Sequence, residues 1–398
     1  MELIDKNRPA AAWIAGLRAR FPCEREIDRV LTRKLERRAG AGFTPLSLAV
    51  LADAVRALIA AHHAGPFSVE DCAWLGGGAS KIQMAFTLAW TPPGALHTRS
   101  RMVLRMEPAE SIIETSRIRE FQLLRAMAGQ VPVPPVYWVD GEGAWLPYPG
   151  LVYGFVAGVT KPANAPSQAT GMGTYFAPEW RAPLGAQFVA HLARIHTVDI
   201  AAIEAPAFDV PANPRAAATA GLATWERVWE EDADEDIPLL RLTAAWLHAH
   251  VPTAARLAVV HGDYRTGNFL FTEHDARITA LLDWEMARIG DPHQDLAWAT
   301  APAYGHVDDA GRRFLVGGFL PEAEFFARYE EATGFTVEPK SLHYYRVYTG
   351  YMQGVIAVGT AWRIARNGKT HQDALLAWIV GIGSMLLDDL RRLLEQGA

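Results

Sequence analysis

The stretch that decides the fold is Val259-Val260-His261-Gly262-Asp263-Tyr264-Arg265-Thr266-Gly267-Asn268-Phe269-Leu270-Phe271. An apolar run ends in a polar turn and a second apolar run follows, which predicts two short strands joined by a compact loop. Asp263 precedes Asn268 by five positions, so this loop can direct both side chains into one cleft. Phosphoryl transfer needs a carboxylate to orient the attacking hydroxyl, and oxygen ligands for magnesium. We interpret Asp263 as the catalytic base and Asn268 as a metal ligand.

A second carboxylate follows 20 residues after Asp263, in the segment Ala280-Leu281-Leu282-Asp283-Trp284-Glu285. The apolar run predicts a strand that ends at Asp283. A lone aspartate at a strand end usually caps a turn or a helix. Here, however, the strand–loop–strand–loop order and both spacings suit one metal site. We therefore interpret Asp283 as a second ligand of magnesium bound to nucleotide phosphates.

The 398-residue chain divides into three parts by its pattern. Residues 1–66 have helical periodicity and form an N-terminal extension. Residues 67–156 contain short apolar runs separated by glycine and proline, which predict a small β-rich lobe with one helix at 111–128. Residues 157–398 are mainly helical, with candidates at 184–197, 222–231, 238–250, 322–333 and 341–366. A ligand between two such lobes is expected, because ligands favour domain interfaces.

The motifs around Asp263 and Asp283 resemble those of a known family. Segments 261–271 and 281–298 are similar to the signature of the aminoglycoside phosphotransferase and choline kinase-like superfamily, and the resemblance extends over residues ~68–390. It implies an α+β, protein-kinase-like two-lobe fold that binds ATP (with GTP left open) and Mg²⁺ and phosphorylates a small-molecule alcohol. In the continuation 289–297, Asp291 and Asp295 are expected to be structural, capping a helix and bonding the catalytic loop.

The glycine run Leu75-Gly76-Gly77-Gly78-Ala79-Ser80-Lys81 lies between two predicted strands, where a kinase places its phosphate-covering loop. Gly77 and Gly78 would allow close backbone approach, and the Ser80 hydroxyl could meet phosphate oxygens. Lys81 either adds charge at the phosphates or faces water. By itself this run also suits a flexible hairpin.

The following strand offers Arg105 as the cation for the α/β-phosphates, where protein kinases use lysine. Glu120 is the favoured helix partner of Arg105, and Glu114 is the alternative. Residues 151–158 resemble the hinge between the lobes. Backbone groups near Tyr153 and Val156 would contact the adenine there.

A looser resemblance narrows the substrate. Residues 225–229, Pro238, residues 245–247 and Pro252 resemble phosphotransferases related to the kinase domain of acyl-CoA dehydrogenase family members ten and eleven. It implies a hydroxy acid, a hydroxyacyl thioester or another apolar alcohol as acceptor. An aminoglycoside acceptor is the alternative, and a catalytically silent nucleotide-binding regulator is the rival outside the enzyme class.

Composition limits the partners. The formal net charge of −6 argues against nucleic acid. Two cysteines and no signal segment predict a cytoplasmic protein, and the apolar stretch 374–387 suits a buried core helix better than a membrane span. The acidic cluster at 230–236 is expected to be a solvated loop. Oligomeric state is left open, with a homodimer as one option.

Overall fold

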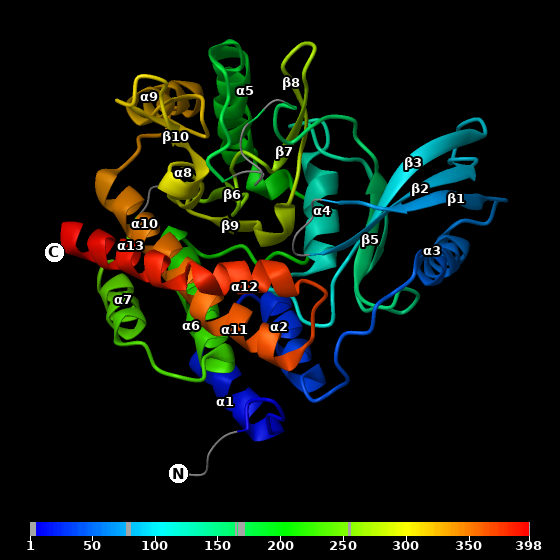
Figure 1. The fold of residues 1–398 in the computed structure, drawn as a ribbon, viewed down its shortest axis with the longest axis horizontal. Helices are drawn as coiled ribbons and strands as arrows, with labels where there is room; N and C mark the ends of the chain where they lie inside the picture. Colours follow the sequence, from blue (N-terminus) through cyan, green and yellow to red (C-terminus); the bar gives the residue numbers. More distant parts are fainter. Residues whose placement is uncertain (1–4, 77–80, 164, 166–171, 254–255, 398) are drawn as a thin grey trace.

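The computed structural model describes residues 5–76, 81–163, 165, 172–253 and 256–397, and it forms two lobes with a cleft between them (Figure 1). The smaller lobe is built on one antiparallel sheet in the order β1-β2-β3-β5-β4. Its elements are β1 (Ser68–Trp74), β2 (Ile82–Trp90), β3 (Thr98–Met106), α4 (Arg117–Met127), β4 (Val136–Asp140) and β5 (Gly150–Gly154). The predicted β-rich lobe is therefore present.

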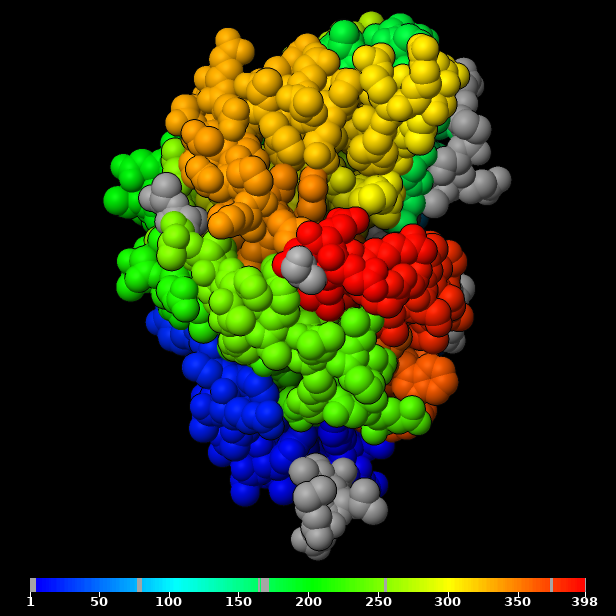
Figure 2. Space-filling model, turned by 90° about the vertical axis from the view of Figure 1, so that its left-hand side faces the viewer, coloured from blue at the N-terminus to red at the C-terminus, as the bar shows by residue number. Residues whose placement is uncertain are grey.

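The N-terminal extension contributes to both lobes. Helix α3 (Leu48–His62) begins after Ser47, whose side chain accepts a hydrogen bond from the Val50 N–H. Its apolar face is buried against the sheet, in a cluster with strands β1 to β5. By contrast, α1 (Ala11–Arg20) and α2 (Arg25–Arg37) contact helix α6 (Pro214–Asp232) of the larger lobe. In Figure 2 this blue segment lies below the green helices.

The larger lobe is mainly helical, as expected. Its helices are α5 (Pro178–Thr197), α6 (Pro214–Asp232), α7 (Pro238–Ala249), α8 (His293–Ala299), α9 (Glu322–Thr333), α10 (Pro339–Gly354), α11 (Ala361–Asn367), α12 (Asp373–Gly381) and α13 (Gly383–Gln396). Its strands are β6 (Ala258–Val260), β7 (Phe269–Thr272), β8 (Arg277–Leu281), β9 (Arg288–Gly290), β10 (His306–Val307), β11 (Phe314–Val316) and β12 (Leu320–Pro321). Strand β6 pairs with β9, and β7 pairs with β8.

Helix α4 begins six residues later than the sequence predicts. The Ser116 side chain accepts the Arg119 N–H and caps the helix, so the first helical residue is Arg117 rather than Ser111. Residues 107–116 form a loop instead. Glu107 of this loop accepts hydrogen bonds from Lys81 and Ser111, which holds the loop against the end of β2.

The acidic cluster is a solvated loop only in part: Asp234, Glu235 and Asp236 are exposed between α6 and α7, but for the residues within α6 that expectation is wrong. Glu231 and Asp232 belong to the last turn of α6 and are buried. Lys34 Nζ of α2 lies 2.7 Å from Glu231 Oε2, and Arg38 Nη2 lies 2.6 Å from Asp232 Oδ1. Buried carboxylates need such partners because desolvation penalises an isolated charge. The N-terminal extension is thus joined to the larger lobe by buried ion pairs.

The apolar stretch 374–387 also differs from expectation. It is divided between α12 and α13, which meet at Ile382, and Trp378 and Met385 are exposed. It is therefore not a single buried core helix. Among the described residues, no helix has the length and apolarity that a membrane crossing requires.

Candidate active site

A cleft of about 260 Å³ lies between the two lobes and is open to solvent. Both lobes supply its walls, and the predicted residues on them are Arg105, Glu120, Tyr153, Val156, Asn268 and Asp283. Tyr153 lies on β5, which pairs with β3 beside Arg105. Gly77, Gly78 and Ser80 lie outside the described residues. The cleft therefore brings together the predicted hinge, the predicted phosphate cation and both predicted metal ligands.

Asp263 is held in the loop after β6 by three side-chain donors. Asn268 Nδ2 donates to Asp263 Oδ2 at 2.6 Å and to the Asp263 carbonyl at 2.9 Å. Arg265 Nε and Trp298 Nε1 each donate to Asp263 Oδ1 at 2.7 Å. Burial raises the pKa of Asp263, and the Arg265 guanidinium opposes that rise. The carboxylate is thus fixed in orientation beside the Asn268 amide.

The loop itself is anchored by Asp295 of α8. Its Oδ2 accepts the His261 N–H at 2.7 Å, and its Oδ1 accepts the Gly262 N–H at 2.8 Å. This confirms that Asp295 bonds the catalytic loop. Buried His196 contacts the same carboxylate, with Nε2 3.0 Å from Asp295 Oδ2. His196 also contacts the Tyr329 hydroxyl through Nδ1 at 2.7 Å, so both of its ring nitrogens are occupied by structural contacts.

Asn268 and Asp283 are brought side by side by the β7–β8 pair. The Leu282 N–H donates to the Asn268 carbonyl at 2.7 Å, which aligns the two segments. Asp283 follows with φ of +66°, a left-handed conformation that is uncommon outside glycine and concentrates at functional sites. Asn268 Nδ2 points to Asp263, so the amide oxygen is the atom left to act as a ligand.

These two oxygen donors suit magnesium, which prefers oxygen ligands and usually keeps water and substrate phosphates in its coordination sphere. In the described part of the chain, no group of three His, Cys, Asp or Glu side chains could hold a metal alone. A metal at Asn268 and Asp283 would take its remaining ligands from the nucleotide and water.

Arg105 joins the two lobes through carboxylates. Its Nη2 lies 2.8 Å from Glu285 Oε2 and also bonds Asp283, while its Nε lies 3.6 Å from Glu120 Oε1 on α4. Glu120, and not Glu114, is therefore the helix partner in this structure. Opposite charges at these distances raise the pKa of the Arg105 guanidinium, so it stays cationic.

Lys81 is occupied elsewhere. Its Nζ donates to Glu107 Oε2 at 2.7 Å and to Ser111 Oγ at 3.1 Å, and its side chain is buried. Of the two alternatives for Lys81, the one in which it faces water is wrong. Because its ammonium group is committed to Glu107, Arg105 is the better placed cation for phosphates in the cleft.

The model of the phosphotransferase enzyme family matches residues 95–338, which include every element of this site from β3 to α8. The chain belongs to this family. Mouse acyl-CoA dehydrogenase family member 10 is 28% identical over 51% of this chain and 18% of its own length, so the match spans under a fifth of that relative.

Solved structures agree on the fold. A protein of Ralstonia eutropha, solved under the provisional name of an aminoglycoside phosphotransferase, has a TM-score of 0.62 at 23% identity over 86% of this chain and 98% of its own. A mutant of aminoglycoside phosphotransferase APH(4)-Ia bound to ADP and hygromycin B has a TM-score of 0.50 at 16% identity, covering 81% of this chain and 95% of its own. The predicted protein-kinase-like fold is confirmed.

Three members of this candidate site were missed from the sequence. Trp298 donates to Asp263, while Arg117 and Glu285 form a buried ion pair with 2.9 Å between Arg117 Nη2 and Glu285 Oε2. Trp298 and Glu285 stand in the quoted motif segments, but nothing in their spacing shows which atom they contact. Arg117 carries no local signal, because its partners come from other parts of the chain.

We expect Trp298→Phe to lower kcat by about 10- to 100-fold, since a hydrogen bond to a charged group contributes about 1.5–3 kcal/mol. The indole holds Asp263 but does not line the nucleotide cleft, so the KM for ATP should stay near the wild-type value. Steady-state kinetics would measure both. The matched control is Trp378→Phe, because Trp378 lies on α12 and is exposed. A rise in the KM for ATP that accompanies the fall in kcat would contradict a positioning role for Trp298.

Glu114 predicts a pH-dependent stability. Burial raises the pKa of its carboxyl from 4.5 to about 7, with Glu107 adding to the rise, although Glu114 Oε1 accepts the Ser111 N–H at 2.9 Å. The folded state therefore holds an extra proton between about pH 4.5 and pH 7. The free energy of unfolding should fall as pH rises through that window.

Glu114→Gln replaces the titratable carboxyl group with an amide of nearly the same shape, so position 114 no longer gains or loses a proton in this pH range. As pH rises from 5 to 8, the free energy of unfolding of wild type should fall by about 3 kcal/mol relative to that of Glu114→Gln. Urea unfolding at the two pH values would measure the difference. Glu36→Gln removes an exposed carboxyl from α2 and is the control; equal pH dependence in wild type and Glu114→Gln would refute the assignment.

Proposed function

We propose that the chain transfers the γ-phosphoryl group of ATP, with magnesium, to the hydroxyl group of a hydroxy acid, a hydroxyacyl thioester or another apolar alcohol. The proposal depends on the hydrogen bonds that hold Asp263, Asn268 and Asp283 next to one another. The Asn268 amide donates a hydrogen bond to the Asp263 carboxylate, and the Asn268 carbonyl accepts one from the N–H of Leu282, the residue before Asp283. Asn268 and Asp283 line the interlobe cleft and Asp263 lies beside Asn268, an arrangement that supports the roles of two metal ligands and a base.

Each residue has a distinct task in this transfer. Asp263 accepts a hydrogen bond from the acceptor hydroxyl and takes its proton as the hydroxyl oxygen forms a bond to the γ-phosphorus. The bond between the γ-phosphorus and the β,γ-bridging oxygen breaks, and ADP leaves with that electron pair. Asn268 and Asp283 would hold magnesium, which when bound offsets the charge of the phosphates.

Arg105 supports the same charge balance from the smaller lobe. It is positioned by Glu120 and Glu285, so its guanidinium is fixed before nucleotide binds. Pre-positioned charge of this kind lowers the barrier without reorganisation during the reaction. ATP as the nucleotide is supported by the ADP complex of APH(4)-Ia, whose fold this chain shares.

The charge pattern supports an apolar acceptor over an aminoglycoside. Aminoglycosides are polycations, and the acidic cluster near α6 is the densest negative feature of the sequence. Three of its carboxylates are already in ion pairs: Glu231 and Asp232 pair with α2, and Asp234 pairs with Arg363 and Arg366. The likeness to acyl-CoA dehydrogenase family member 10 points in the same direction.

A panel of acceptors tests the proposal. Magnesium-dependent ADP release should be measured with hydroxy acids, hydroxyacyl thioesters, apolar alcohols and aminoglycosides. We expect turnover in one of the first three classes and little with aminoglycosides. Turnover confined to aminoglycosides would establish the alternative substrate, and ATP binding without turnover on any alcohol would favour a silent nucleotide-binding protein.

A further inference from the structure

A buried group of charged side chains includes Arg105 and joins the two lobes beside the cleft. Its members come from β3, from positions just outside β2 and β3, from α4 and from the segment after Asp283. We call this group the buried charge cluster, and it consists of Lys81, Arg105, Glu107, Arg117, Glu120 and Glu285. No member is more than 7% exposed. Charges this deeply buried persist only where they are paired, so the pairing fixes where each charge lies.

Arg117 is the member that contacts all three carboxylates. Its Nε lies 2.9 Å from Glu107 Oε1, its Nη2 lies 2.9 Å from Glu285 Oε2, and its Nη1 bonds Glu120. Arg105 pairs with two of the same carboxylates, Glu120 and Glu285, and it lines the interlobe cleft. Arg117 does not line that cleft where the structure describes it. Arg117 is therefore placed to act on Arg105 and not on a ligand.

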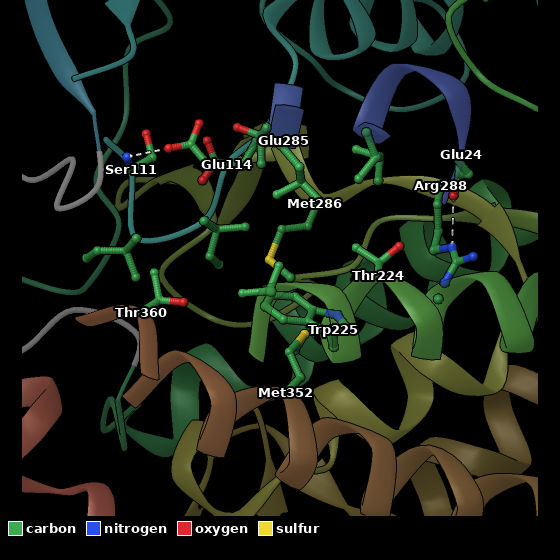
Figure 3. A pocket seen from close by; sticks show the side chains of 18 of the residues that line it. Glu24, Ser111, Glu114, Thr224, Trp225, Glu285, Met286, Arg288, Met352 and Thr360 are labelled. Carbon is green, nitrogen blue, oxygen red and sulfur yellow. Dashed lines mark hydrogen bonds and ion pairs between the residues drawn. The ribbon is translucent and has the colours of Figure 1, made fainter. Parts of the chain in front are cut away.

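The charges of the cluster balance one another. Among the described residues that form it, three cations face three carboxylates, so its formal charge is zero. Asp283 also bonds Arg105, but it lines the cleft with its side chain 25% exposed. Glu114 and Glu285 line the same small cavity (Figure 3). Because burial raises the pKa of Glu114 to about 7, this carboxyl adds little charge in mildly acidic solution.

The balance depends on Arg117. Without it, the same three carboxylates would share Lys81 and Arg105, and the cluster would carry one excess negative charge beside the phosphate site. Little water screens a charge in such a buried place, so it acts strongly on its neighbours. The carboxylates would hold the Arg105 guanidinium more tightly, and the phosphates of a nucleotide would be repelled.

We propose that Arg117 is a positioning residue for nucleotide binding: it neutralises Glu120 and Glu285, and so leaves the Arg105 guanidinium able to contact phosphate oxygens. The inference rests on the proposed function, since it takes the interlobe cleft as the ATP site. When ATP binds, Arg105 exchanges its contact with Asp283 for a phosphate oxygen and keeps its contacts within the cluster. Arg117 thus controls the affinity for ATP without touching the nucleotide.

The test measures the Kd of ATP with magnesium by calorimetric titration of the full chain at about pH 6. Arg117→Met removes the charge and keeps an unbranched side chain, and it should raise this Kd about 10- to 100-fold. Glu285→Gln keeps the shape and removes a negative charge, so the Kd should not rise. The double variant with both changes restores the charge balance, and its Kd should return to within about threefold of wild type. A purely structural role predicts the opposite: each single variant weakens binding, and the double variant weakens it most.

The matched control is Arg125→Met, because Arg125 lies on the same helix and is exposed. Its Kd should equal that of wild type. Arg117→Lys keeps the charge and should bind ATP more tightly than Arg117→Met. If Arg117→Met does not fold, Glu285→Gln and the double variant decide.

The outcomes separate this inference from the proposed function. A Kd raised about tenfold or more in Glu285→Gln, or a double variant that binds no better than Arg117→Met, overturns the inference. ATP binding in wild type with no transfer to any alcohol overturns the proposed function and leaves the inference standing. Absence of ATP binding in wild type overturns both.

Discussion

Replacing Asp263 with asparagine should lower kcat by about 10²- to 10⁴-fold, the range that a positioned acid or base contributes. Asparagine keeps the size of the side chain and its contacts with Asn268 and Trp298 in part, but it cannot take the proton of the acceptor. The affinity for ATP should remain within a few-fold of wild type, because Asp263 orients the acceptor and not the nucleotide. Steady-state kinetics and nucleotide titration would measure the two effects separately.

Asp53→Asn is the matched control for this change. Asp53 lies on the outer helix α3 with its side chain 76% exposed, so the same substitution there should leave kcat unaltered. Retained turnover in Asp263→Asn would contradict its assignment as the base. An equal loss of ATP affinity would indicate that Asp263 serves the nucleotide instead.

Replacing Asp283 with asparagine should act mainly on magnesium–nucleotide binding. The change removes a negative charge that contacts Arg105 and would face the metal, and a charge-assisted contact of this kind contributes about 1.5–3 kcal/mol. The Kd for ATP in the presence of magnesium should therefore rise about 10- to 100-fold. The Kd measured with EDTA should change much less, because only the metal-dependent part of binding is lost.

The control for Asp283 is Asp275→Asn, in the turn between β7 and β8, where the side chain is 44% exposed. Calorimetric titration of ATP with magnesium and with EDTA would be compared for both variants. A magnesium dependence that survives unchanged in Asp283→Asn would contradict its role as a ligand. The two aspartates are thus distinguished by which constant each one alters.

The local parts of this site could be predicted from the sequence. Asp263, Asn268 and Asp283 follow short strands, so their spacing already places them at one edge of the β-structure. Glu120 could be preferred over Glu114, and the structure places it beside Arg105. These inferences depend on a few residues in sequence order, where strand ends and loop length limit where a side chain can lie.

The remaining features depend on contacts between distant segments. Lys81 meets Glu107, and the acidic residues of α6 meet α2, at separations that periodicity cannot detect. The same holds for Trp298, whose indole contacts Asp263 from another helix. The sequence predicts the start of α4 too early, because residues 111–116 are compatible with helix by composition while Ser116 forms the cap.

The central claim is that this chain moves the γ-phosphoryl group of ATP onto an alcohol oxygen at Asp263. The most direct measurement follows the phosphorus resonances by NMR during incubation with ATP, magnesium and the acceptor that turns over fastest. We predict that ADP and one phosphate monoester of the acceptor appear in equal amounts, and that Asp263→Asn abolishes both. Release of inorganic phosphate with no phosphate ester, or an ester formed equally by Asp263→Asn, would contradict the account.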